Sequence, residues 1–233
     1  MNIVARKEKK FLISIDNYYK YSNYLSKILD EDPNNGDNGY TIRSLYFDTL
    51  NDRDFEEKES GIELRRKIRL RLYNPEDDYA ILEMKQKQGD NQLKRSLKIS
   101  KTDANSLIRG QYNVLLNYNE KFSLECYGIM SMYCYRPKTI VEYERKAFIA
   151  KENNIRVTFD KNIVATESNL NIFDKDLLMY PVMDKYNVIL EVKYNSFLLS
   201  YIKDALNLAN QSELSVSKYI LARNVGKNVN IKM

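Results

Sequence analysis

The stretch "IRLRLYNPEDDYAILEMKQK", residues 68–87, has the pattern of two β-strands joined by a turn. The turn formers "NPEDD" occupy residues 74–78, and apolar residues alternate with charged ones on both sides of them. Because successive side chains of a strand point to opposite faces, each strand has one apolar and one charged face. The charged faces carry Arg69 and Arg71 in the first strand, and Glu83, Lys85 and Lys87 in the second.

The same two-faced pattern recurs along the chain and predicts an antiparallel sheet with added helices. At least six stretches alternate in this way, and residues 141–149 do so less regularly. Four other stretches have apolar residues at helical spacing. The predicted strands are residues 6–12, 67–72, 80–87, 94–99, 155–160 and 188–193, and the predicted helices are residues 16–30, 102–118, 120–134 and 197–210.

Two architectures are compatible with strands of this kind. One is an open antiparallel sheet with its charged face in water. The other is a closed barrel whose charged faces line the interior and whose apolar faces lie outward under helices. The charged faces are dominated by Arg and Lys, and neighbouring like charges destabilise a sheet. We therefore expect an anion among these cations, which favours the barrel.

The composition limits the chemistry. The 233 residues suit one domain, spanning 1–233, and the net charge of +5 is compatible with an anionic partner. The absence of histidine excludes His general bases, Ser-His and Cys-His nucleophile pairs, and HExxH zinc sites. A bound metal would therefore be held by carboxylates, which favours Mg²⁺ or Mn²⁺.

Cysteine usage and the absence of targeting segments indicate a cytoplasmic protein. Cys126 and Cys134 lie on one predicted helix, and we expect both to be buried, reduced side chains. The N-terminal "MNIVARKEKKF" lacks the apolar region of a signal peptide. No stretch approaches the roughly 20 apolar residues of a membrane span, so direct membrane insertion is not expected.

Eight stretches, in one order, resemble a known family. The chain is similar to the VTC domain, the polyphosphate polymerase domain of the vacuolar transporter chaperone type, in the triphosphate tunnel metalloenzyme superfamily. The resemblance runs from about Arg6 to Arg223. The stretches are "RKEKKFLIS" (6–14), "YTIRSLYFDT" (40–49), "RRKIRLRLYN" (65–74), "LEMKQK" (82–87), "RPKTIVEYERKAF" (136–148), "IRVTFDKNI" (155–163), "VILEVKYN" (188–195) and "SVSKYILAR" (215–223).

The resemblance implies an α+β fold, an eight-stranded antiparallel β-barrel tunnel with a basic interior and helices packed outside. It implies a divalent metal, Mn²⁺ or Mg²⁺, and ATP, polyphosphate or triphosphate as partners. The polymerase branch transfers the γ-phosphoryl group of ATP to a growing polyphosphate chain. Other branches hydrolyse triphosphate or thiamine triphosphate, or cyclise ATP. By analogy, a separately encoded membrane partner is also expected.

The chain departs from the superfamily pattern at two positions. The hydrolase and cyclase branches usually begin with a Glu-x-Glu-x-Lys strand, but here Arg6 replaces the first Glu. This favours the VTC branch and removes one potential metal ligand. Some polymerase members carry a basic residue two positions before the Ser-Lys pair, where this chain has Ser215.

The family match and the strand alternation together predict the site residues. One Arg side chain can donate two parallel hydrogen bonds to the oxygens of a phosphate group, which suits a triphosphate or polyphosphate ligand. Glu83 is either a metal ligand or a salt-bridge partner that separates neighbouring lysines. The predicted catalytic residues are Arg69, Arg71, Arg145, Arg156 and Lys193; the phosphate-binding residues are Lys10, Lys85, Lys87, Lys94, Tyr143, Ser217 and Lys218; and the metal ligands are Glu191, Glu8 and Glu83.

The predicted function is a metal-dependent polyphosphate polymerase that uses ATP. A triphosphatase with the same tunnel is the first alternative and differs only in the acceptor. A non-catalytic polyphosphate- or nucleotide-binding module is the second, and Ser215 keeps it open. Nucleic-acid binding is disfavoured, because the charged faces are nearly free of the aromatic side chains on which bases stack.

Overall fold

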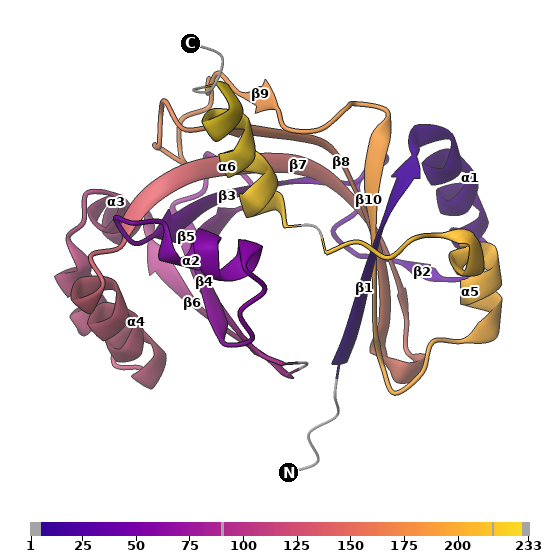
Figure 1. Ribbon diagram of the computed structural model, residues 1–233, viewed down its shortest axis with the longest axis horizontal. Coiled ribbons are helices and arrows are strands. Elements are labelled where there is room, and N and C mark those ends of the chain that lie inside the picture. The colour runs from indigo at the N-terminus through magenta and orange to yellow at the C-terminus, as the bar shows by residue number, and fades with distance from the viewer. Residues whose placement is uncertain (1–5, 90, 216, 230–233) are drawn as a thin grey trace. The chain divides into compact units, whose positions relative to one another are not determined.

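The computed structural model describes residues 6–89, 91–215 and 217–229 (Figure 1). These residues form an α+β fold around a ten-stranded sheet, in which two of the strands are only two residues long. The elements in chain order are β1 (Arg6–Ser14), α1 (Ile15–Leu25), β2 (Asp30–Glu31), β3 (Tyr40–Asp48), α2 (Arg53–Glu59), β4 (Arg65–Leu72), β5 (Tyr79–Gln88), β6 (Asn91–Ser100), α3 (Lys101–Ile108), the 3₁₀ helix η1 (Tyr112–Asn117), α4 (Lys121–Met132), β7 (Arg136–Ala150), η2 (Glu152–Asn154), β8 (Ile155–Thr166), β9 (Tyr180–Pro181), β10 (Asn187–Asn195), α5 (Ser200–Ala205), η3 (Leu208–Asn210) and α6 (Lys218–Val229).

The chain divides into two compact units. Strands β3, β7 and β8 contribute to both units. The hydrogen-bonded strand order is β1-β10-β8-β7 in unit 1 and β7-β3-β4-β5-β6 in unit 2. Unit 1 consists of Met1–Thr41, Tyr143–Ile163 and Met183–Ser217, and unit 2 of Ile42–Glu142, Val164–Val182 and Lys218–Met233.

The core of unit 1 lies on the apolar side of β1, β10 and β8. Phe11, Phe159 and Leu190 are buried there, and α1 and α5 cover this side (Figure 1). The hydroxyl of Ser14 caps α1 by accepting a hydrogen bond from the backbone N–H of Asn17. Since side chains alternate along a strand, the other face of β1, β10 and β8 carries the charged residues.

The core of unit 2 lies on the apolar side of β3, β4 and β5. Leu45, Leu70 and Leu82 form one cluster with residues of α3, η1 and α4, such as Leu107 and Met130. Figure 1 shows α3 and α4 together on this side of β5 and β6. The apolar residues of the hairpin at 68–87 are therefore core residues, and its charged residues lie on the opposite face.

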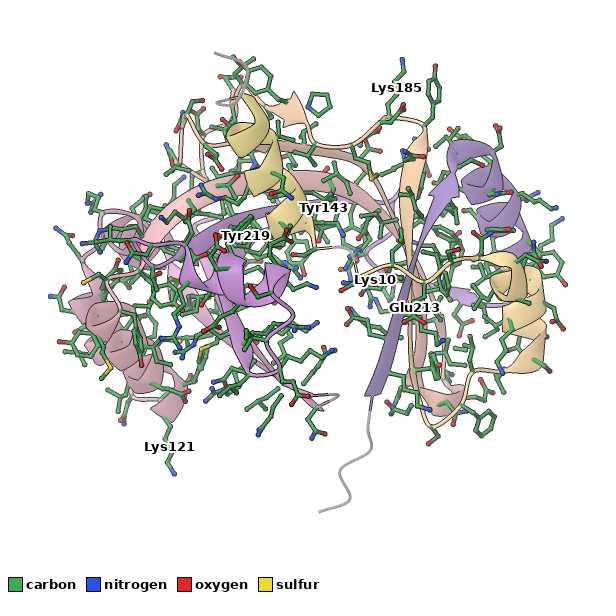
Figure 2. The ribbon with its side chains drawn as sticks, viewed as in Figure 1. Lys10, Lys121, Tyr143, Lys185, Glu213 and Tyr219 are labelled. Carbon is green, nitrogen blue, oxygen red and sulfur yellow. The ribbon has the colours of Figure 1, made fainter. Side chains whose placement is uncertain are left out.

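Two helices that the sequence did not predict, α2 and α6, are anchored at the end of β3 in unit 2. The carboxylate of Asp48 accepts hydrogen bonds from the backbone N–H groups of Asp54 and Phe55, in the first turn of α2. It also accepts one at 2.6 Å from the hydroxyl of Tyr219 on α6 (Figure 2). The Tyr219 ring stacks on Tyr46 of β3, with 5.2 Å between centroids. This stacking and the hydrogen bond to Asp48 hold α6 against β3 in unit 2.

The predicted strands are confirmed, but three predicted helices are shorter than expected. Helix α1 ends at Leu25, residues 102–118 divide into α3 and the 3₁₀ helix η1, and α5 covers only Ser200–Ala205. Polar and turn-forming residues end each helix before its apolar pattern stops. The predicted fold class, α+β with eight main antiparallel strands, is confirmed. The assignment of residues 1–233 to a single domain stays a prediction.

The prediction that both cysteines are buried is wrong for Cys134. Cys126 is buried in α4, whereas Cys134 lies just beyond the end of that helix, exposed, with a positive φ of 50°. The helix ends before residue 134 because the backbone turns into the left-handed region there. Among the described residues, no helix combines the length and the apolar composition needed to cross a membrane.

Gly39 provides a test of the packing of unit 1. Its φ is +97°, and a Cβ atom there would lie 2.2 Å from the backbone oxygen of Arg145 on β7. We expect Gly39→Ala to lower the free energy of unfolding by about 2 kcal/mol or more, because both the backbone conformation and the contact become unfavourable. Gly128→Ala in α4 is the matched control, since nothing lies within 4 Å of its Cβ position. Urea denaturation measures both effects, and equal stability of the two variants would contradict this packing.

Candidate functional site

The charged face of unit 2 carries a large excess of positive charge. In the registers of β4 with β5 and of β5 with β6, the residues opposite one another share a face. Within these three strands as the structure describes them, that face has one carboxylate, Glu83, and eight cations. The cations are Arg65, Lys67, Arg69, Arg71, Lys85, Lys87, Lys94 and Lys98.

Glu83 holds three of these cations. The Nε and Nη2 atoms of Arg69 lie 2.7 and 2.6 Å from Glu83 Oε2. Lys94 Nζ lies 2.5 Å from Oε1, and Arg71 Nη1 lies 3.8 Å from the same oxygen. Glu83 is only 3% exposed. Burial alone would raise the pKa of its carboxyl, but the three cations outweigh burial and lower the pKa to about 2.

Both oxygens of Glu83 are therefore engaged by cations. A metal ligand needs at least one carboxylate oxygen facing the metal, and the three cations would repel a divalent ion. The geometry favours the salt-bridge role for Glu83 over the role of metal ligand. One negative charge opposite three positive ones also leaves the face able to bind further anions.

Arg69 is fixed from a second direction. Its Nη1 donates a hydrogen bond of 3.1 Å to the hydroxyl of Tyr46, the residue opposite it on β3. Tyr46 is 6% exposed, and its ring is stacked on the ring of Tyr219. The guanidinium is thus positioned before any ligand binds, which lowers the entropy cost of binding.

The charged face of unit 1 is nearly neutral at its centre. The register places Lys10 of β1 opposite Glu191 of β10, and Glu8 opposite Lys193. Lys10 Nζ (Figure 2) lies 3.0 Å from Glu8 and 3.6 Å from Glu191. Lys193 Nζ lies 3.8 Å from Glu8 and also contacts Glu191. Burial acts to lower the pKa of Lys10, but Glu191 and Glu8 outweigh it and raise the pKa above its ordinary value.

The two arginines predicted in unit 1 are also paired with carboxylates. Arg145 Nε and Nη2 donate to the two oxygens of Asp160 at 2.6 and 2.7 Å, and the guanidinium lies 5.3 Å from the centroid of the Tyr143 ring. Burial acts to lower the pKa of Arg145, but Asp160 outweighs it and raises the pKa. Arg156 Nη2 lies 2.5 Å from Asp32 and donates to the Tyr40 hydroxyl at 3.0 Å.

The remaining predicted residues lie on β5, on β6 and at the start of α6. Lys85 and Lys87 are half-buried on β5, and Lys94 is half-exposed on β6. Ser217 directly precedes α6 and Lys218 is its first residue; both are half-buried. The structure therefore groups Arg69, Arg71, Lys94 and Glu83 in unit 2, and Lys10, Lys193, Glu8, Glu191 and Arg145 in unit 1.

Two carboxylates of unit 1, Glu8 and Glu191, are the remaining candidates for metal binding. Among the described residues, no three His, Cys, Asp or Glu side chains are grouped so that they could hold a metal ion. Mg²⁺ commonly uses only one or two carboxylates and completes its shell with water and substrate phosphates. Glu8 and Glu191 lie close together, because the same two lysines contact both of them. Each of their four oxygens is paired with Lys10 or Lys193, so a metal ion at this place requires that these lysines turn away.

The sequence pattern missed several partners of the predicted residues. Asp160 shares a face with Arg156, so the alternation of β8 could have indicated it. Asp32 lies in a loop and carried no such signal. The expectation that the charged faces are nearly free of aromatic residues is wrong, since Tyr46 and Tyr143 lie on them. Both are buried, so they are not available for base stacking.

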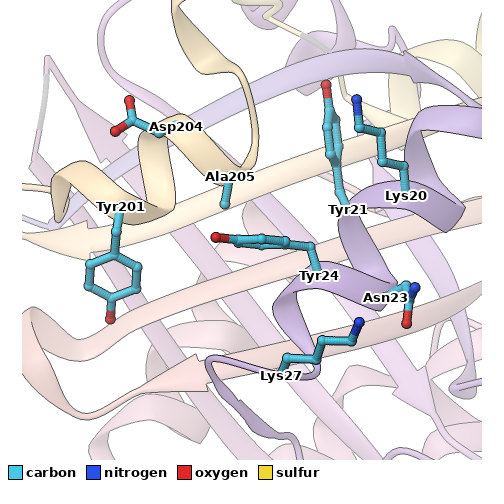
Figure 3. A pocket seen from close by; sticks show the side chains of 8 residues that line it. All are labelled: Lys20, Tyr21, Asn23, Tyr24, Lys27, Tyr201, Asp204 and Ala205. Carbon is cyan, nitrogen blue, oxygen red and sulfur yellow. The ribbon is translucent and has the colours of Figure 1, made fainter.

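A separate open pocket of about 610 Å³ lies between α1 and α5 in unit 1 (Figure 3). These helices cover the apolar side of β1 and β10, so the pocket is on the side away from the charged face. No predicted site residue lines it. The lining residues are Lys20, Tyr21, Asn23, Tyr24, Lys27, Tyr201, Asp204 and Ala205.

The environment of Glu83 predicts a specific pH dependence. Because its pKa is lowered from 4.5 to about 2 in the folded protein, its contribution to stability is present above pH 4.5 and is lost as the pH falls towards 2. We expect Glu83→Gln to lower the free energy of unfolding at pH 7 by roughly 3 kcal/mol. Urea titrations between pH 7 and 2.5 should show the difference between wild type and variant shrinking below pH 4.5.

Glu76→Gln is the control for this titration. Glu76 pairs with Lys175 on the surface, and both side chains are 61% exposed, so its loss should leave the unfolding midpoint unchanged. A constant difference between wild type and Glu83→Gln over the whole pH range would contradict the assignment of the lowered pKa to Glu83.

Two solved structures have the same fold at low sequence identity. A putative adenylate cyclase from Vibrio parahaemolyticus is 13% identical with a TM-score of 0.52, over 94% of this chain and 97% of that one. A putative adenylate cyclase from Bacillus halodurans is 11% identical with a TM-score of 0.51, over 91% and 95% of the two chains. At these identities the likeness shows the fold alone. No curated protein sequence matches the chain.

The family model of the VTC domain matches residues 5–225, which is nearly the whole chain. This range contains both charged faces and all the residues predicted for the site. The strand pattern and the structural neighbours agree with the predicted α+β triphosphate tunnel fold. The chain belongs to the VTC domain family.

Proposed function

We propose that the protein is a metal-dependent polyphosphate polymerase, which transfers the γ-phosphoryl group of ATP to a growing polyphosphate chain. The observation that carries this proposal is the charged face of unit 2, where the described strands β4, β5 and β6 set eight cations against Glu83 alone. Neighbouring like charges on a sheet repel one another. A polyanion relieves this repulsion along the whole face, and Arg binds each phosphate through two hydrogen bonds.

The length of the cation row favours a chain over a triphosphate. Arg65, Lys67, Arg69 and Arg71 alternate along β4, so the row extends over about 20 Å at the rise of a β-strand. A triphosphate group is shorter than this row and would contact only part of it. The extended row therefore supports a polymerase over a triphosphatase.

The reaction requires positioning and charge neutralisation rather than a protein nucleophile. The attacking group is a terminal oxygen of the acceptor chain, so the absence of histidine is compatible with catalysis. Arg69 and Arg71 would orient the phosphate groups, as would Arg145, Arg156 and Lys193 in unit 1. Glu191 and Glu8 would hold Mn²⁺ or Mg²⁺, which neutralises negative charge on phosphoryl oxygens when it is bound.

A non-catalytic polyphosphate-binding module is the second candidate. Ser215 is exposed and stands where some polymerases have a basic residue. A module would use the same cations but would not turn over ATP. A triphosphatase would turn over the nucleotide with water as the acceptor.

Incubation of the purified protein with ATP and Mn²⁺ distinguishes these functions. The products are resolved on a gel that separates polyphosphates by length. We expect long chains. Free phosphate without chains would support the triphosphatase, and tight polyphosphate binding without turnover would support the binding module.

Arg69→Ala should abolish chain synthesis, because this residue contacts both Glu83 and Tyr46 at the centre of the face. Circular dichroism should show that the variant remains folded. Arg53→Ala is the matched control, since Arg53 is exposed and pairs with nearby groups of unit 2, Glu57 and the Tyr133 ring. Full activity of Arg69→Ala would contradict the proposed site.

A further inference from the structure

Two buried hydrogen-bond donors on the charged face of unit 2 have no acceptor. The hydroxyl of Ser44 on β3 and the Nε–H of Arg71 on β4 are both inaccessible to solvent, and neither has a hydrogen-bond partner. The two residues lie directly opposite one another in the register of β3 with β4. Most buried polar groups in proteins are hydrogen-bonded, so two neighbouring exceptions indicate a missing acceptor.

Arg71 differs from the other arginines that have an unpartnered buried Nε. Arg95 and Arg223 each hold a carboxylate through another nitrogen, at 2.7 Å to Glu125 and at 2.6 Å to Asp52. Within the described residues, the one ion pair of Arg71 is the 3.8 Å contact with Glu83. The guanidinium of Arg71 can therefore turn towards a ligand without breaking a short hydrogen bond.

Ser44 is itself completely buried. On the side of β4, its neighbours are Arg71 and the fixed pair of Tyr46 and Arg69. Because the hydroxyl is inaccessible to solvent, an acceptor can reach it only after a neighbouring side chain has moved. Movement of the Arg71 side chain would open this position.

We infer that Ser44 is a substrate-binding residue, and that its hydroxyl and Arg71 Nε–H donate together to one non-bridging oxygen of a phosphate group. This inference rests on the proposed function, since it assumes that the charged face of unit 2 binds phosphate. A hydroxyl donor and a charged donor that converge on one point suit a phosphoryl oxygen, which accepts several hydrogen bonds at once. Ser44 adds a fixed donor that a mobile surface lysine cannot supply.

The test is isothermal titration of tripolyphosphate into the full chain at pH 7, with the melting temperature of each free protein measured alongside. Ser44→Ala should bind roughly tenfold more weakly than wild type or worse, as expected for loss of a hydrogen bond to a charged group. The melting temperature of the free variant should be unchanged or higher, because the lost hydroxyl has no partner in the free protein.

Ser123→Ala is the matched control. Ser123 is also completely buried in unit 2, but its hydroxyl donates to the backbone oxygens of Tyr118 and Glu120. This variant should melt at a lower temperature and bind tripolyphosphate as wild type does. Ser44→Cys is a second test variant, since it keeps the approximate size of the side chain but is a weak donor.

The outcomes separate this inference from the proposed function. If Arg69→Ala loses binding while Ser44→Ala and Ser44→Cys bind within twofold of wild type, the role of Ser44 is wrong and the proposed face stands. If wild type does not bind tripolyphosphate, both the proposed function and the inference are wrong. A lower melting temperature of Ser44→Ala with unchanged affinity would show a purely structural hydroxyl and overturn the inference.

Discussion

The charged face of unit 2 depends on one buried carboxylate. Glu83 contacts Arg69, Arg71 and Lys94, and it lies on the same β5 strand whose alternate residues, Leu82 and Met84, are in the core. The packing of the hairpin therefore fixes the position of the carboxylate, and the carboxylate fixes the cations. Without the Glu83 carboxylate, the positive charges of Arg69, Arg71 and Lys94 would repel one another. With Glu83 present, the face still has a positive excess that an anion can neutralise.

The two units distribute charge differently. In unit 1, Lys10, Lys193, Arg145 and Arg156 each contact a carboxylate, so that face is nearly balanced. In unit 2, the described strands β4, β5 and β6 place eight cations on the face of Glu83, which contacts three of them. Under the proposed function, the balanced face provides carboxylates for a metal ion and the unbalanced face provides binding energy for a phosphate chain.

The alternation of charged and apolar residues was sufficient to predict most of the charged faces, because successive side chains of a strand point to opposite sides of the sheet. It correctly placed Arg69 with Arg71 and Lys10 with Glu8. It could not show that Asp32, in a loop, pairs with Arg156, since that contact depends on the path of the chain between strands.

Ser44 was missed for another reason: β3 is buried on both sides, so its sequence lacks a clear alternation. Helix α2 was missed because its sequence, RDFEEKE, has a single apolar residue and therefore no apolar period. Helix α6 was missed because Asp48, which anchors it, is distant in the sequence.

A crystal structure of the protein with tripolyphosphate and Mn²⁺ tests the central claim most directly. The account predicts phosphate groups along β4 and β5, with oxygens within hydrogen-bonding distance of Arg69 and Arg71, and Glu83 still paired with Arg69. Phosphate density confined to the outer surface, or a ligand that leaves Arg69 and Arg71 without contacts, would contradict it.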